Sequence, residues 1–113
     1  MKDISPFIFE KLDTDDTYSL TLDAGEGYKS ELFLSREDEG FIGNGYDWES
    51  LALVYLNECA PHLINAIEFD SEAEMFCVYS SDRGSITEFA EGFTAAVSDD
   101  ERAADLFSRA EII

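Results

Sequence analysis

The fold turns on residues 43–52, which read Gly43-Asn44-Gly45-Tyr46-Asp47-Trp48-Glu49-Ser50-Leu51-Ala52. The glycines on either side of Asn44 permit a sharp turn, because glycine adopts positive φ without a steric penalty. Apolar residues then recur at helical spacing and share one face: Trp48, Leu51, Ala52, Tyr55, Leu56 and Cys59. We therefore expect Asp47 to cap a helix that runs to about Cys59. Pro61 then closes the helix, and the turn aims Trp48 inward.

The residues before this helix predict a loop. Residues 35–46 (SREDEGFIGNGY) hold three consecutive acids and three glycines. A phosphate-binding loop is the alternative, but the segment lacks the third glycine of the motif and its Lys-Ser/Thr pair. Asp47 would also occupy the helix N-terminus, where an anion would bind. Gly43, Gly45, Asp47 and Trp48 are therefore interpreted as a structural motif.

The N-terminal third predicts a β-hairpin. Residues 6–12 are rich in aromatic and branched side chains, and residues 18–23 alternate apolar with polar positions. The polar segment 13–17 between them is typical of a turn, because short Asx and Thr side chains bond their own backbone. Residues 29–34 suggest a third, shorter strand.

The C-terminal half predicts a second hairpin and two helices. Residues 63–69 and 75–79 flank the polar turn 70–74. Ser85-x-x-Glu88 and Ser98-x-x-Glu101 both match the capping box that begins a helix. The expected buried residues of these helices are Ile86, Phe89, Ala90, Phe93 and Val97 in the first and Ala103, Leu106, Phe107 and Ala110 in the second.

These elements predict an α+β fold of one domain over residues 1–113. In the order β-β-(β)-α-β-β-α-α, four to five strands form a mainly antiparallel sheet, with about three helices packed on one face. A length of 113 residues suits one core, and a hydrophobic content of 45% argues against disorder.

The charge restricts the partners. The chain carries 26 acidic and seven basic residues, a formal net charge of −19. Such a field repels phosphate backbones and anionic bilayers, so we expect no direct binding to nucleic acid or membrane. It favours fast, salt-sensitive docking onto a basic protein surface. We expect Cys59 and Cys77 to be buried free thiols in the reducing cytoplasm, since no signal or spanning segment is apparent.

The residues that commonly carry catalysis or bind metals form no recognisable site. The one histidine, His62, follows Pro61 at a helix end, where a surface or capping role is usual. One His and two Cys cannot supply a zinc site. Asp13, Asp15 and Thr17 alternate as in a calcium loop, but the later ligand positions do not follow. We expect no metal, no cofactor and no catalysis, with a carboxylate-based enzyme as the least favoured reading.

Two segments resemble a known family. Residues 43–52 resemble the stretch that marks the immunity protein 51 family of bacterial polymorphic toxin systems, described as α+β domains with a characteristic tryptophan. Residues 67–82 are similar to the second hairpin of the same family. The resemblance implies a cytoplasmic immunity protein that binds and neutralises a cognate toxin by stoichiometric occlusion. A nuclease with a basic cleft is one toxin class that an acidic protein fits.

The sequence also nominates contact residues. The acids most concentrated in sequence are Asp13, Asp15 and Asp16 at one turn and Glu37, Asp38 and Glu39 in the loop. Tyr46 projects from the same loop as an aromatic anchor in this interpretation. The alternative function is an acidic adaptor or regulatory subunit of a larger cytoplasmic complex.

Overall fold

Four strands form one antiparallel sheet in the order β1-β2-β4-β3 in the computed structural model, which describes residues 2–12 and 16–113. The strands are β1 (Ile8–Lys11), β2 (Tyr18–Asp23), β3 (Glu68–Phe69) and β4 (Met75–Ser80). Both predicted hairpins are therefore present: β1 pairs with β2, and β3 with β4. Residues 13–15 of the first turn lie outside the described residues.

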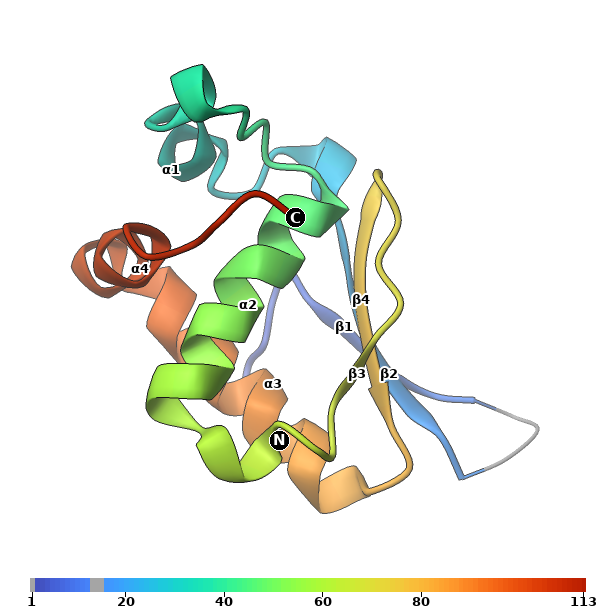
Figure 1. Cartoon of the computed structure of the whole chain (residues 1–113). Helices are drawn as coiled ribbons and strands as arrows, with labels where there is room; N and C mark the ends of the chain where they lie inside the picture. The colour runs from blue at the N-terminus through green and yellow to red at the C-terminus, as the bar shows by residue number, and fades with distance from the viewer. Residues whose placement is uncertain (1, 13–15) are drawn as a thin grey trace.

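Helices cover one face of this sheet (Figure 1). The α-helices of the described residues are α1 (Ser30–Leu34), α2 (Gly45–Cys59), α3 (Arg83–Ser98) and α4 (Asp100–Phe107). Short 3₁₀ turns, η1 (Ala24–Glu26), η2 (Glu37–Glu39) and η3 (Pro61–Leu63), link them. Helices α2 and α3 contact the sheet directly, and α4 packs against both helices. This arrangement confirms the predicted α+β class with its antiparallel sheet.

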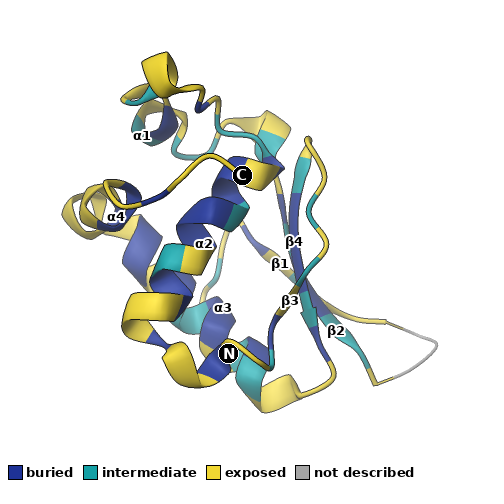
Figure 2. Cartoon of the chain, in the orientation of Figure 1, coloured by how far each residue is buried: buried dark blue, intermediate teal, exposed yellow. Residues whose placement is uncertain are grey.

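Strand register separates a buried face from an open one. Phe9, Leu20, Val78 and Phe69 align across the four strands, and Leu20 and Val78 are fully buried under the helices. Because successive strand residues point to opposite faces, the neighbouring positions point away from the helices. Figure 2 shows the buried residues concentrated where the helices meet the sheet.

An aromatic cluster around Trp48 forms the centre of the core. Trp48 is 1% exposed, as the sequence predicts. Its ring lies 5.1 Å from that of Phe33 and 5.8 Å from those of Phe7 and Tyr28, and it stacks on Tyr28. It also contacts Phe93 of α3 and Phe76 of β4. One side chain thereby joins α2 to the sheet, to α3 and to the segment before α2.

The motif that begins α2 differs in one respect from its sequence interpretation. Asn44, not Asp47, is the N-cap, and its Oδ1 accepts a hydrogen bond from the Asp47 amide at 2.8 Å. Asp47 lies one turn further along and is buried. Its Oδ2 accepts from the amides of Ile42 at 2.7 Å and Gly43 at 2.8 Å. The Asp47 carboxylate therefore satisfies the backbone of the loop, and Asn44, which directly precedes the helix, provides the cap.

Gly45 is fixed by a close approach of two backbones. Its amide donates to the carbonyl of Ala73 in the β3–β4 turn at 2.9 Å. A Cβ at this position would overlap the Glu72 carbonyl oxygen and lie 2.5 Å from that of Met75. At position 43, by contrast, glycine is required because the backbone φ is +81°, a conformation that residues with a Cβ rarely adopt. The two motif glycines thus serve different purposes, one for the turn and one for contact.

The predicted short strand at residues 29–34 is wrong. Residues 30–34 form the helix α1, entered through Gly27 and Lys29, both with positive φ. Two left-handed residues in close succession turn the chain away from an extended course. Phe33 is buried against Trp48 and Phe107, so its apolar character reflects the core of a helix.

Both predicted capping boxes are also displaced, although the helices exist. Asp82 caps α3 and Asp99 caps α4. Asp99 Oδ1 accepts from the Glu101 amide at 3.1 Å and the Arg102 amide at 3.2 Å. Ser98, in contrast, ends α3 and donates to the Thr94 carbonyl. In each case a nearby aspartate, three residues before Ser85 and one after Ser98, provides the capping oxygen instead. Every residue predicted to be buried in these two helices is buried.

Two smaller expectations also change. Residues 63–66 belong to η3 and the turn after it, so the third strand begins only at Glu68. Cys77 is buried as predicted, whereas Cys59 is exposed at the end of α2. Its sulfur lies 3.6 Å from Arg102 Nη2, so this residue lies beside α4 and outside the core.

We expect Gly45→Ala to lower the free energy of unfolding by about 1–3 kcal/mol or more, because the methyl group meets backbone that cannot rotate away. Chemical denaturation followed by tryptophan fluorescence measures the change. Gly84→Ala is the matched control, since its Cβ would make only ordinary contact. Equal stability of both variants would contradict the close approach.

Candidate functional site

The acidic loop predicted from the sequence forms a regular turn on the protein surface. Glu37, Asp38 and Glu39 form η2 and are exposed. Gly40 follows with a φ of +108° and ends the turn. The loop lies beside α1 at the end of the molecule where α2 begins (Figure 1).

Arg36 holds this loop in place. Its guanidinium forms two hydrogen bonds to the Glu39 carboxylate, at 2.7 and 2.8 Å. The Nη1 atom donates to the carbonyl of Phe107, the last residue of α4, and to that of Ala110, which follows the helix. The same group lies over the rings of Phe41 and Phe107, at 4.6 and 5.0 Å from their centroids. The loop is therefore attached to the core and to the C-terminal segment.

The three acids of the loop are consequently not equivalent. The hydrogen bonds from Arg36 hold the pKa of Glu39 below its usual value. Glu39 is thus committed to an internal ion pair. Glu37 and Asp38 form no ion pair among the described residues and face solvent. These two carboxylates carry the charge that the loop offers to a partner.

Exposed apolar side chains lie around the same loop. Ile42 is 68% exposed, Tyr46 42% and Ile112 49%. The chain places them together: Ile112 Cδ1 lies 3.7 Å from the Cβ position of Gly40, and Ile42 precedes the turn into α2. Tyr46 is exposed on the first turn of α2, as expected of an anchor. Glu37, Asp38, Ile42, Tyr46 and Ile112 are called the loop surface below.

The other acidic cluster lies elsewhere. Asp16 is exposed beside the β1–β2 turn, whereas Asp13 and Asp15 lie outside the described residues. Figure 1 shows the end of β1 and the start of β2 at the opposite end of the molecule from α1, beside which η2 lies. Asp16, which precedes β2, is therefore separate from the acidic loop at η2.

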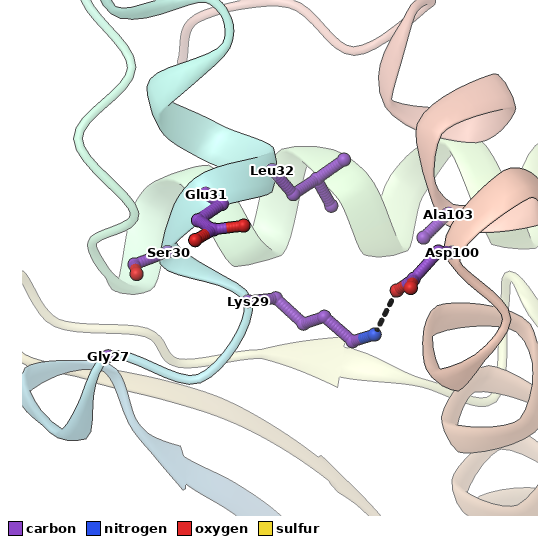
Figure 3. Close-up of a pocket in the computed structure, with 7 residues that line it drawn as sticks. All are labelled: Gly27, Lys29, Ser30, Glu31, Leu32, Asp100 and Ala103. Carbon is purple, nitrogen blue, oxygen red and sulfur yellow. Dashed lines mark hydrogen bonds and ion pairs between the residues drawn. The ribbon is translucent and has the colours of Figure 1, made fainter.

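The hollow between α1 and α4 contains an internal ion pair. It measures about 460 Å³ and is lined by Gly27, Lys29, Ser30, Glu31, Leu32, Asp100 and Ala103 (Figure 3). Lys29 Nζ lies 2.7 Å from Asp100 Oδ1, and this contact lowers the pKa of Asp100. The lysine is therefore neutralised by the protein itself. The pair links α1 to α4, and this hollow offers no free cation to an anionic ligand.

The remaining reactive side chains have ordinary surroundings. His62 is exposed in η3, and its Nε2 lies 2.5 Å from Glu88 Oε2, so it has the surface position expected of it. Burial raises the pKa of the Cys77 thiol. Within residues 2–12 and 16–113, no cluster of three or more His, Cys, Asp or Glu side chains has metal-binding geometry. In the same residues, every helix falls short of the length and apolarity that a bilayer span requires.

Sequence reasoning missed two parts of the surface. Ile42 and Ile112 were not nominated as contact residues, and no local sequence signal marks either of them as exposed. The open face of the sheet follows from the prediction that the helices pack on one face, but its residues were not nominated as contacts either. The alternation of apolar and polar residues in β2 is the signal that one face of the sheet lacks a covering layer.

We expect Arg36→Ala to lower the free energy of unfolding by about 1–3 kcal/mol, because buried carbonyls lose a charged donor. Amide hydrogen exchange should increase in residues 37–42 and at the end of α4. Arg83→Ala, at an exposed position, is the control and should change neither quantity. Unchanged exchange in the loop of Arg36→Ala would show that other contacts hold it.

Comparison with known proteins identifies the family. The family model described as Immunity protein 51 matches residues 9–112. No curated protein and no solved structure is significantly similar to the chain. The match spans the sheet, the Gly43–Trp48 motif and all four α-helices. The chain therefore belongs to the immunity protein 51 family.

Proposed function

We propose that this protein protects its own cell by binding a cognate toxin domain in the cytoplasm and covering the toxin's working surface, without catalysis. Membership of an immunity protein family supports a toxin as the partner. The observation that carries the mode of binding is the loop surface. There, two carboxylates that form no ion pair among the described residues lie on a loop that Arg36 holds in place, beside the exposed side chains of Ile42, Tyr46 and Ile112.

This combination suits protein recognition. Binding costs less free energy when the contact residues are already ordered, and Arg36 orders this loop before any partner arrives. Tyrosine and isoleucine exclude water from the centre of an interface, and the carboxylates select a basic partner. A solvated acidic loop with no function would not need exposed Ile42 and Tyr46 beside it.

The charge of the whole chain supports a basic toxin. A net charge of −19 accelerates the approach of a positively charged protein and slows that of an acidic one. A nuclease is the toxin class that this argument favours, because its cleft must attract phosphate. Carboxylates placed over such a cleft would compete with the nucleic acid for the same basic side chains.

We expect Glu37→Lys with Asp38→Lys to slow association with the cognate toxin domain by about tenfold or more at low salt. The dependence of the association rate on salt should weaken as well. Stopped-flow or surface plasmon resonance measurements over a series of salt concentrations give both values. The fold should remain intact, because surface substitutions usually change stability by no more than about 0.5 kcal/mol each.

Glu88→Lys with Glu101→Lys is the matched control, because both residues are exposed on α3 and α4, the net charge changes equally, and the only pair lost among the described residues is the exposed contact of Glu88 with His62, which contributes little to stability. If both pairs slow association to the same extent, only the net charge matters and the loop surface is not the contact. If the wild-type protein does not bind this toxin domain at micromolar concentration, the proposed function is wrong. Co-purification with an unrelated cytoplasmic assembly would then favour an adaptor.

A further inference from the structure

The face of the sheet that points away from the helices has no covering layer. Strand register aligns Ile8, Thr21 and Cys77 in one row of this face and Glu10, Ser19, Tyr79 and Glu68 in the next. Asp23 and Met75 form a further pair on this face, beside the row of Thr21 and Cys77 and at the start of β4. Ile8 is 53% exposed, and Met75 and Tyr79 are partly exposed. This sheet face therefore combines the exposed or partly exposed apolar side chains of Ile8, Met75 and Tyr79 with the smaller side chains of Ser19, Thr21 and Cys77 on the two central strands.

Carboxylates lie around these apolar side chains. The exposed acids are Glu10 on β1, Asp23 at the end of β2, Glu68 on β3, and Asp70, Glu72 and Glu74 around the β3–β4 turn. Of the seven basic residues only Lys11 is in a strand, and its position in the register puts it on the helix side. The charge of Glu68 raises the pKa of Tyr79. The sheet face thus carries negative charge that no cation of its own balances.

A hollow marks one end of this face. It measures about 370 Å³ and is lined by Ile8, Thr21, Asp23, Glu72, Glu74 and Met75. Its lining combines the apolar side chains of an isoleucine and a methionine with a threonine and three acidic residues. Arginine and lysine have the matching chemistry, because an alkyl stem ends in a cation. A second copy of this chain would bring its own acids to the same carboxylates, so charge disfavours self-association through this face.

The hollow adjoins the start of α2. The Gly45 amide donates to Ala73, which lies between Glu72 and Glu74, and Tyr46 follows at once in the chain. A stable interface involves about 20–30 residues on each side. The loop surface alone has five. A partner seated on Tyr46 and Ile42 needs further contacts, and the β3–β4 turn leads directly from Tyr46 to the hollow.

We propose that the open sheet face is the second half of the toxin interface, and that a Lys or Arg side chain of the toxin inserts into the hollow between Ile8, Met75 and the carboxylates of Glu72 and Glu74. This inference rests on the proposed function and specifies where the toxin sits. The basic side chain is an anchor of the complex, since a cation that leaves water for a site lined by carboxylates keeps paired charge.

The test places a cation of the protein's own in the hollow. Thr21→Lys should weaken the affinity for the cognate toxin domain by about tenfold or more, because the new ammonium pairs with the carboxylates that line the hollow. Isothermal titration calorimetry measures the affinity, and circular dichroism with thermal unfolding checks the fold. Thr87→Lys is the matched control, since Thr87 is equally half-buried but belongs to α3 in the helix layer.

A second variant keeps the test decisive if Thr21→Lys fails to fold. Glu72→Gln with Glu74→Gln removes charge without adding bulk and should also weaken binding and flatten its salt dependence. If the wild type binds and both variants bind equally well, the sheet face is not part of the interface and only this inference fails. If the wild type does not bind, the proposed function fails with it. A concentration-dependent dimer that Thr21→Lys abolishes in sedimentation would assign the face to a second copy.

Discussion

The structure depends on the contact between the first turn of α2 and the β3–β4 turn. Gly45 approaches the backbone of residues 72–75 so closely that no side chain fits, and its amide bonds to Ala73. This contact directs Trp48 into the centre of the aromatic core, where it meets residues from both hairpins and from α1 and α3. Asp47 and Asn44 satisfy the backbone of the loop that arrives there.

The same contact arranges the surface. Because Gly45 is buried against the turn, the next residue, Tyr46, points to solvent, while Glu72 and Glu74 face outward from the turn itself. Arg36 fixes the acidic loop on the other side by bonding to carbonyls at and after the end of α4. The core and the proposed interface therefore share one segment, and a recognisable family motif does not by itself distinguish stability from binding. In this chain Gly45 and Trp48 serve the core, and Tyr46 is free for a partner.

Periodicity was sufficient for most of the fold. The faces of α3 and α4, the burial of Trp48 and the pairing within both hairpins follow from apolar spacing. The caps did not follow, because Asp82 and Asp99 compete with nearby serines and only geometry shows which one accepts. Residues 29–34 form too short a segment for the apolar pattern to distinguish a helix from a strand. The positive φ of Lys29 cannot be predicted from the residue type either.

The site was partly predictable. Glu37, Asp38 and Tyr46 are exposed as the sequence suggests. The ion pair between Glu39 and Arg36, in contrast, is visible only in the three-dimensional structure. The open sheet face required the knowledge that β4 lies between β2 and β3, which brings Met75 beside Asp23 and Ile8 into one row with Cys77. No local pattern contains that order.

The central claim is that protection is stoichiometric occlusion, and a titration of toxin activity with this protein tests it most directly. At toxin concentrations far above the dissociation constant, the account predicts a linear loss of activity that reaches zero at one immunity protein per toxin domain. Activity that returns on separation of the complex would agree with it. Complete inactivation by a small fraction of an equivalent, or a toxin left chemically altered, would contradict it.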